Sequence, residues 1–301
     1  MRVMLIGKSG MLGSVFLKML AGSEDFEMFA FGREEMDLNN KKVVDELFER
    51  ISPDFVINCA AYTNVDGAEE AEGEAFAVNA EAVRALARVC KREKAVLVHF
   101  STDYVFDGKR EDGYAEDDAT APLGVYGKSK LAGEVAIAEE MEEYYIVRTA
   151  WLYGEDGANF VDTMLRLGQE VLEGKREGLS VVSDQVGSPT YTHDLYRVVM
   201  GRFLSPFLGN VERHHEHSLG HDGGGSKLPF GIYHVTNSGK CSWFEFAKEI
   251  FKQRGMEVLV SETTAAEFGR PAPRPGNSIL ISTKADFGVR SWQEGLRAYL
   301  G

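Results

Sequence analysis

The start of the chain places an apolar run directly before a glycine-rich turn, and this order constrains the fold more than any other feature. Residues 3–6 predict a buried strand, and residues 15–20 predict a helix. Between them the spacing Gly-x-x-Gly-x-x-Gly lets backbone N–H groups approach a pyrophosphate at a helix N-terminus. A plain tight turn is the alternative. The candidate cofactor-binding residues here are Gly7, Lys8, Ser9, Gly10, Met11, Leu12 and Gly13.

Strands and helices are predicted to alternate after this turn. The expected strands are 26–31, 55–61, 97–101 and 145–150, and the helices between them include 42–51 and 74–92. This alternation predicts an α/β fold with a Rossmann-type doubly wound parallel sheet. Ligands of such sheets bind beyond the carboxyl ends of the strands. The glycine turn and residues 60–63, 101–103 and 149–151 all lie at such ends.

A tyrosine and a lysine follow the fourth predicted strand at helical spacing. Tyr126 and Lys130 are four residues apart, so on a helix they share one face. With the hydroxyl of Thr102 at the strand end, this arrangement suits proton delivery to a carbonyl that is being reduced. We expect the ammonium to favour the phenolate and so to lower the pKa of Tyr126. A surface tyrosine and lysine at chance spacing are the alternative.

Two polar residues carry hints about the cofactor. Arg33 follows the second strand, where NAD enzymes tend to carry an acid, so it indicates a 2′-phosphate and therefore NADPH, with NADH as the alternative. A solvated arginine in a charged turn is the alternative explanation. Asn79 interrupts the apolar spacing of a helix and is either a surface residue or an anchor of the active-site loop.

Composition limits the classes of partner and compartment. The net charge of −14 argues against nucleic acid and against an anionic membrane surface. The three cysteines are far apart and suggest no disulfide framework, so a reducing cytoplasm is expected. The chain begins with a strand rather than a signal peptide, and no run of about 18 apolar residues could span a bilayer.

The second half is less regular and suggests a second lobe. The expected division gives 1–150, with about 175–208 and 231–236, to a dinucleotide-binding domain, and about 151–174 and 237–301 to a substrate lobe. Residues 209–230 form a His/Gly-rich surface insert, for which a metal site is the less favoured alternative. Arg270 and Arg274 lie in a Pro-rich loop and could supply a basic pocket for an anionic substrate, or a simple surface turn.

Taken together, these motifs resemble the extended short-chain dehydrogenase/reductases and, within them, the dTDP-4-dehydrorhamnose reductase family. The resemblance covers nearly the whole chain. It rests on the blocks Ser101-Thr102-Asp103-Tyr104-Val105-Phe106, Tyr126-x-x-x-Lys130, Thr149-Ala150-Trp151, Asp184-Gln185-x-Gly187-x-Pro189-Thr190 and Arg274-Pro275-x-Asn277-Ser278.

The resemblance implies a role for each matching residue. Tyr126 would give a proton to the C4 oxygen of a 4-keto nucleotide sugar, and Lys130 would tune Tyr126 and hold the nicotinamide ribose. Thr102 and Asp103 would bind the sugar near C4, with Trp151 packed beside it. The implied cofactor contacts are Lys8 to Leu12 for the pyrophosphate, Asp37 and Leu38 for the adenine, and Ala60, Ala61 and Tyr62 at a strand end. Tyr62 departs from the histidine of many relatives.

The resemblance also leaves alternatives open. A sugar-nucleotide 4-epimerase, or a reductase of another 4-keto nucleotide sugar, would share Tyr126 and Lys130. A non-catalytic NADP-binding regulatory subunit is a third reading, against which intact Thr102, Tyr126 and Lys130 argue. A nucleotide-sugar substrate is expected in the first two cases, and a homodimer is the assembly considered for the chain.

Overall fold

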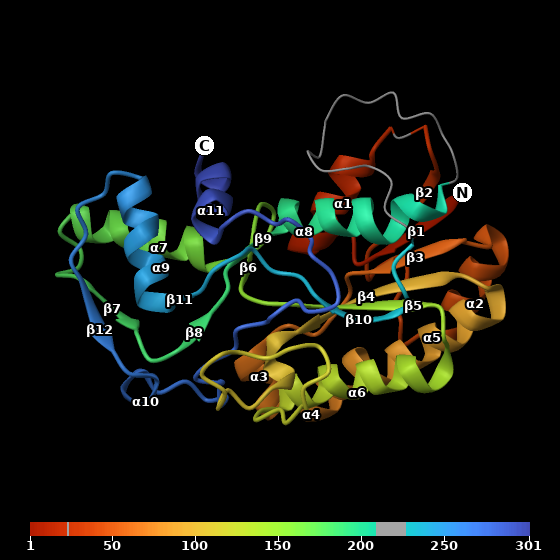
Figure 1. Cartoon of the computed structure of the whole chain (residues 1–301), viewed down its shortest axis with the longest axis horizontal. Helices are drawn as coiled ribbons and strands as arrows, with labels where there is room; N and C mark the ends of the chain where they lie inside the picture. The colour runs from red at the N-terminus through yellow and green to blue at the C-terminus, as the bar shows by residue number, and fades with distance from the viewer. Residues whose placement is uncertain (23, 209–226) are drawn as a thin grey trace.

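A six-stranded parallel sheet forms the centre of the protein, seen here in a computed structural model that describes residues 1–22, 24–208 and 227–301 (Figure 1). The α/β doubly wound prediction is confirmed. In order across the sheet, the strands are β10 (Gly231–His234), β5 (Tyr144–Thr149), β4 (Val96–Thr102), β3 (Phe55–Asn58), β1 (Arg2–Ile6) and β2 (Glu27–Phe31).

Helices cover both faces of this sheet, and the strands are apolar on both sides for that reason. Val3 and Leu5 pack into one core cluster, whereas Met4 and Ile6 pack into the cluster on the opposite face. In Figure 1, α1 and α8 lie on one side of the sheet, and α2, α5 and α6 lie on the other. Their bounds are Met11–Leu20 (α1), Thr192–Val198 (α8), Lys41–Ile51 (α2), Ala82–Glu93 (α5) and Val125–Glu140 (α6).

The strand order reverses at β1. The chain passes from β1 to β2 on one side and then crosses to β3 on the other side of β1. Doubly wound sheets bind ligands where the strand order reverses in this way, at the carboxyl ends of the strands. The glycine turn that follows β1 therefore lies at the binding edge of the sheet.

The second lobe has its own apolar core, at the left of Figure 1. Its helices are α7 (Phe160–Leu172), α9 (Trp243–Gln253), α10 (Ala265–Phe268) and α11 (Trp292–Leu300). Its short strands are β6 (Leu152–Tyr153), β7 (Leu179–Val182), β8 (Val186–Gly187), β9 (Thr190–Tyr191), β11 (Cys241–Ser242) and β12 (Val260–Thr263). Because β7 pairs with β12 and α8 packs on the sheet, the packing favours a lobe boundary near the start of α8, inside the segment 175–208. The division into lobes stays a proposal.

Two predicted elements differ in detail. The third strand ends at Asn58 rather than at residue 61, because the chain then leaves the sheet. The long helix predicted over 74–92 is interrupted: α4 (Glu72–Phe76) is followed by a π-helical turn, Ala77–Glu81, before α5 begins. Such turns occur often at functional sites. A further short helix, α3 (Val65–Glu70), precedes α4.

Most of the predicted insert lies outside the described residues, and with it the histidine cluster at 214–221. Within the described ranges, no three or more metal-binding side chains gather as a candidate metal site. No helix among those residues has the length and apolar character needed to cross a bilayer.

Candidate active site

The glycine turn after β1 packs too closely for side chains. Gly7 has φ +86°, and a Cβ there would lie 2.7 Å from the backbone nitrogen of Ala60. A Cβ on Gly13 would collide with the carbonyl of Gly7. The helix α1 then begins without a side-chain cap on its N-terminal N–H groups. Donors without a side-chain cap at a helix N-terminus beside a glycine turn suit a pyrophosphate, so these residues fit a dinucleotide.

Beyond the turn, charged residues line the end of β2. Glu35 accepts a hydrogen bond from Lys8 at 2.6 Å and another from the backbone of Gly32 at 2.7 Å. The side chain of Arg33 is 84% exposed, and its Nε lies 3.9 Å from Asp37. Leu38 is buried. The Arg33 guanidinium is therefore exposed and only weakly paired, so it can contact a phosphate group of a bound ligand.

Asn79 anchors the loop that follows β3, as one of the two sequence readings predicted. The side chain is buried, accepts from the backbone N–H of Tyr62 at 2.9 Å and donates to the carbonyl of Tyr62 at 3.0 Å. It also donates to the hydroxyl of Ser129 on α6 at 3.0 Å. The π-helical turn thus joins the predicted cofactor loop, Ala60 to Tyr62, to the helix that carries Tyr126.

Thr102, Asp103 and Tyr126 come together at the carboxyl end of β4. Thr102 donates its hydroxyl to Asp103 at 2.9 Å, and the Tyr126 ring lies edge-on to Tyr104 with centroids 5.9 Å apart. Burial raises the pKa of Tyr126 to about 12, although a hydrogen bond with Thr102 opposes the rise. The expected lowering of this pKa by Lys130 is wrong in this structure, because burial dominates. A neutral phenol at ordinary pH can still donate a proton.

Lys130 is buried one helical turn beyond Tyr126. Its Nζ donates to the carbonyl of Phe100 at 2.6 Å and lies 3.3 Å from Nε2 of His99. Burial lowers the pKa of Lys130 to about 8, while the negative charge of Glu134 acts in the opposite direction. The lysine is therefore able to exchange its proton near working pH.

Several buried polar atoms at this edge have no hydrogen-bond partner within the described chain. They are Oγ of Ser101, Oδ2 of Asp103 and Oγ1 of Thr149. Burial raises the pKa of Asp103 to about 6, while the hydroxyls of Ser278 and Thr102 oppose the rise. Since unpaired buried polar atoms cost free energy, their presence at adjacent strand ends fits a polar ligand.

Trp151 stands at the junction of the two lobes. It adopts φ +48° and stacks on Trp243 of α9, with ring centroids 3.4 Å apart and an interplanar angle of 6°. A Cβ on Gly187 would lie 2.5 Å from the Trp151 ring, which explains the glycine. The indole is fixed on these two sides before any sugar packs beside it.

The two arginines of the Pro-rich loop are held by one carboxylate. Asp66 on α3 lies 3.3 Å from Arg270 and 3.0 Å from Arg274, and it accepts the backbone N–H of Ala272 at 3.2 Å. The predicted basic loop is thus tied to the first lobe by an acid that sequence reasoning missed. No local pattern could have predicted the contact of Asp66 with Arg270, because the two residues lie more than 200 positions apart in the sequence.

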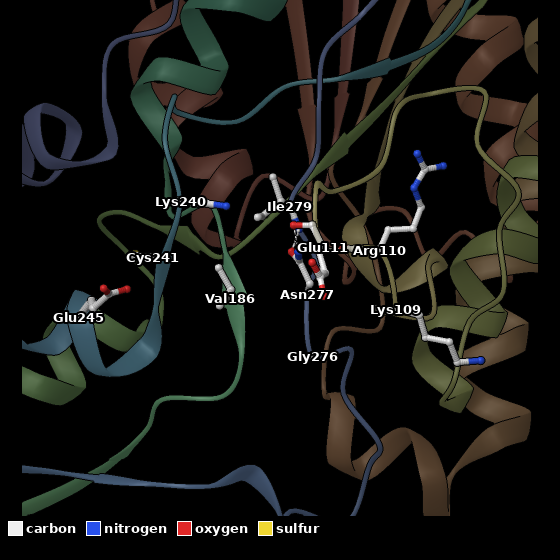
Figure 2. A pocket seen from close by; sticks show the side chains of 11 residues that line it. Lys109, Arg110, Glu111, Val186, Lys240, Cys241, Glu245, Gly276, Asn277 and Ile279 are labelled. Atoms are coloured by element: carbon white, nitrogen blue, oxygen red, sulfur yellow. Dashed lines mark hydrogen bonds between the residues drawn. The ribbon is translucent and has the colours of Figure 1, made fainter.

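A pocket of about 430 Å³ opens between the lobes (Figure 2). The side chains of Val186, Lys240 and Glu245 border one side, and those of Glu111 and Asn277 border the other. None of the predicted site residues lines it. The nearest link to the chemistry is Ser278, which follows Asn277 in the chain and lies beside Asp103.

Comparison with known proteins points to one family. A model described as the RmlD substrate binding domain matches residues 1–301. The chain is 39% identical over 302 residues to the spore coat polysaccharide biosynthesis protein SpsK of Bacillus subtilis (strain 168), covering 99% of this chain and 96% of that protein. It is 37% identical to a dTDP-4-dehydrorhamnose reductase of Aggregatibacter actinomycetemcomitans, covering 98% and 97%.

Two further likenesses bear on substrate and cofactor. A probable dTDP-4,6-dihydroxy-2-methyloxan-3-one 4-ketoreductase of Streptomyces antibioticus is 38% identical and covers 99% of this chain and 94% of that protein. The crystal structure of a dTDP-4-dehydrorhamnose reductase from Bacillus anthracis str. Ames in complex with NADP superposes with a TM-score of 0.86. It is 39% identical and covers 99% of this chain and 98% of that one.

Proposed function

The chain belongs to the RmlD substrate binding domain family, and we propose that it reduces the C4 ketone of dTDP-4-dehydrorhamnose to the alcohol of dTDP-L-rhamnose. The observation that carries the proposal is the convergence of Thr102, Tyr126 and Lys130 at the carboxyl edge of the sheet, next to a glycine turn that fits a dinucleotide. The full-length likeness to named reductases supports the same substrate.

The cofactor is NADPH, and when bound it supplies the hydride. The turn from Gly7 to Gly13 would hold the pyrophosphate through backbone N–H groups. Arg33 would meet the 2′-phosphate, Asp37 and Leu38 would bracket the adenine, and the loop 60–62 would support the nicotinamide end. The NADP complex of a relative supports this choice of cofactor.

Proton delivery falls to Tyr126. Its raised pKa keeps the phenol protonated at neutral pH, so it can donate to the oxygen of C4 as negative charge develops there. The Thr102 hydroxyl, which donates to Asp103 in this structure, would turn its hydrogen to the same carbonyl and polarise it. Lys130 would hold the nicotinamide ribose and, below its own pKa, would contribute positive charge that favours the phenolate left behind.

Sugar binding falls to residues at the strand ends. Asp103 is buried, and its unpaired Oδ2 would accept a sugar hydroxyl. Trp151 would pack against the ring, since its indole is fixed by Trp243.

Tyr126→Phe tests this proposal directly, because it removes one hydroxyl and leaves the ring. We expect turnover of dTDP-4-dehydrorhamnose, followed by NADPH oxidation, to fall at least ~10²-fold, the usual size of general-acid loss. NADPH affinity, measured by fluorescence titration, should persist. Tyr144→Phe, at the opposite end of the sheet, is the matched control. Near-normal turnover in Tyr126→Phe would refute the assignment.

A second candidate is a reductase of another dTDP-4-keto sugar. The Streptomyces relative supports it, because that protein is as similar to this chain as the rhamnose enzymes are and its name specifies a different keto substrate. A panel of 4-keto-6-deoxy sugar nucleotides, assayed by kcat/KM, separates the two. An epimerase would instead return its cofactor unchanged, so stoichiometric loss of NADPH excludes it.

Assembly and compartment are part of the proposal. The relatives that match nearly the full length of the chain include biosynthetic proteins, and this supports a cytoplasmic site of action. A homodimer is the proposed assembly, and sedimentation equilibrium of the purified protein tests it by its mass.

A further inference from the structure

His99 is a buried titratable residue to which the proposed chemistry gives no role. It lies on β4, three residues before Thr102, and only 1% of its surface is exposed. Its two ring nitrogens have different neighbours: Asn58 of β3 on one side and Lys130 of α6 on the other. The surrounding hydrogen bonds determine which nitrogen carries the proton.

The amide of Asn58 can take only one orientation. Its Oδ1 accepts the backbone N–H of Ala60 at 3.1 Å, so its Nδ2 is the atom that faces His99. Nδ2 lies 3.0 Å from Nδ1 of His99 and can only donate. Nδ1 must therefore accept, and it can carry no hydrogen without facing another donor.

The neutral imidazole consequently carries its hydrogen on Nε2. That N–H points to Nζ of Lys130 at 3.3 Å, while Nζ donates to the carbonyl of Phe100 at 2.6 Å. A lysine ammonium has three donors and no acceptor, so it cannot receive this N–H. A neutral amine can accept from His99 and still donate to Phe100.

We propose that His99 is a positioning residue that donates Nε2–H to Lys130 and stabilises the amine form of this lysine. The inference rests on the proposed function only where it concerns turnover. In its amine form Lys130 remains hydrogen-bonded to His99 and Phe100 of β4. It gains and loses its proton close to working pH. Asn58 is part of the same device, because it fixes the tautomer of His99.

Other groups around Lys130 do not replace this contact. Glu134 on α6 is engaged by Arg148 at 2.6 Å, which offsets its charge. Cys59, at the end of β3, is a neutral thiol because burial raises its pKa. Tyr126 is likewise neutral, so His99 is the one ring donor that the described chain places at this amine. The lowered pKa of Lys130 has the direction that such a donor would produce.

Two substitutions of similar size test the roles of the two ring nitrogens of His99 separately. His99→Gln retains a donor where Nε2 stands, whereas His99→Asn retains an acceptor for Asn58 and loses the donor to Lys130. Protein labelled with ε-¹³C lysine allows the Lys130 signal to be titrated by NMR, and Lys130→Arg assigns it. This measurement requires no substrate.

We expect Lys130 to titrate well below the ordinary lysine range in the wild type and in His99→Gln. In His99→Asn its pKa should rise by about half a unit to one unit, the size expected for loss of one hydrogen bond. The alkaline limb of kcat/KM for NADPH should move to higher pH by the same amount. An ordinary wild-type titration, or no difference between the two variants, would overturn the proposal.

The NMR titration tests the role of His99, and the turnover assay tests the proposed function, so the two can fail independently. If the wild type reduces no 4-keto nucleotide sugar, the proposed function fails, while the NMR titration still decides the role of His99. If His99→Asn shifts Lys130 but leaves the alkaline limb in place, the link to turnover is overturned.

Discussion

Two buried cations lie close to each other, and their surroundings are opposite. Arg148 on β5 and Glu134 on α6 are 3% and 2% exposed, and their side chains share three hydrogen bonds of 2.6 to 3.2 Å. The guanidinium also lies over the Phe106 ring at 5.2 Å. Lys130, one turn before Glu134, has a carbonyl and an imidazole as neighbours and no carboxylate bonded to it in the described chain.

The difference separates a structural charge from a reactive one. A buried cation with a bidentate carboxylate keeps its charge and fixes the elements that it joins. A buried cation without such a partner costs stability, and the cost appears as a lowered pKa. Functional sites commonly retain such unfavourable groups because the chemistry needs them. On α6 the two kinds of site are one helical turn apart.

Glu134→Gln should have the largest effect on stability, because it leaves Arg148 buried without its partner. Removing one member of a buried pair typically costs 3–5 kcal/mol, so we expect a loss of about that size in urea unfolding. Glu139→Gln on the same helix breaks an exposed pair with Arg84 and should cost less than about 1 kcal/mol. Equal losses in the two variants would abolish the distinction drawn here.

Lys130→Met should stabilise the protein while it abolishes turnover. The folded pKa of Lys130, about 8, lies below the usual 10.5, so the native state binds fewer protons than the unfolded state between these values. Wild-type stability therefore rises with pH across this window. The variant should gain about 3 kcal/mol below pH 8 and lose this advantage toward pH 10.5. Exposed Lys128→Met is the control, and destabilisation of Lys130→Met at pH 7 would contradict the comparison.

Most of the fold follows from local sequence patterns. The glycine turn between residues 3–6 and 15–20 and the regular alternation of apolar strands with helices predicted the parallel sheet and its binding edge. Local spacing also brought Tyr126 and Lys130 onto one face. These features depend on neighbours within a few residues, which a single sequence displays directly.

The surroundings of the site could not be predicted in the same way. Asp66 meets Arg270 from 204 residues away, and Glu69 accepts the first N–H of α6 from Val125 at 2.8 Å. The sign of the Tyr126 pKa shift depends on burial by distant segments, so spacing alone gave the wrong direction. Long-range pairing and burial are properties of the packed chain rather than of any motif.

Asn79→Ala should weaken cofactor binding and leave the chemical step largely intact. The variant loses the two hydrogen bonds that hold Tyr62, so the loop 60–62 must be ordered by the cofactor itself. We expect the Kd for NADPH to rise about tenfold, near the value of one to two buried hydrogen bonds. Ser129→Ala leaves both bonds to Tyr62 in place; it removes the third contact of Asn79 and the bond from Ser129 to the carbonyl of Tyr126, and it should have a smaller effect on this Kd. An unchanged Kd in Asn79→Ala would show that the loop needs no anchor.

Arg33→Ala should give the smallest effect, because Arg33 is an exposed cation, whereas Arg148 is buried. Among the residues that the structure describes, its ion-pair partner is Asp37, which lies 3.9 Å away and is partly exposed, so little is lost from the protein itself. A contact with the 2′-phosphate would be screened by solvent, and we expect the Kd for NADPH to rise about three- to tenfold while that for NADH stays unchanged. The difference should shrink as salt is raised, since exposed charges are screened. Arg33→Lys, which retains the charge, should recover most of the affinity, and an equal loss for both cofactors would refute a role in phosphate recognition.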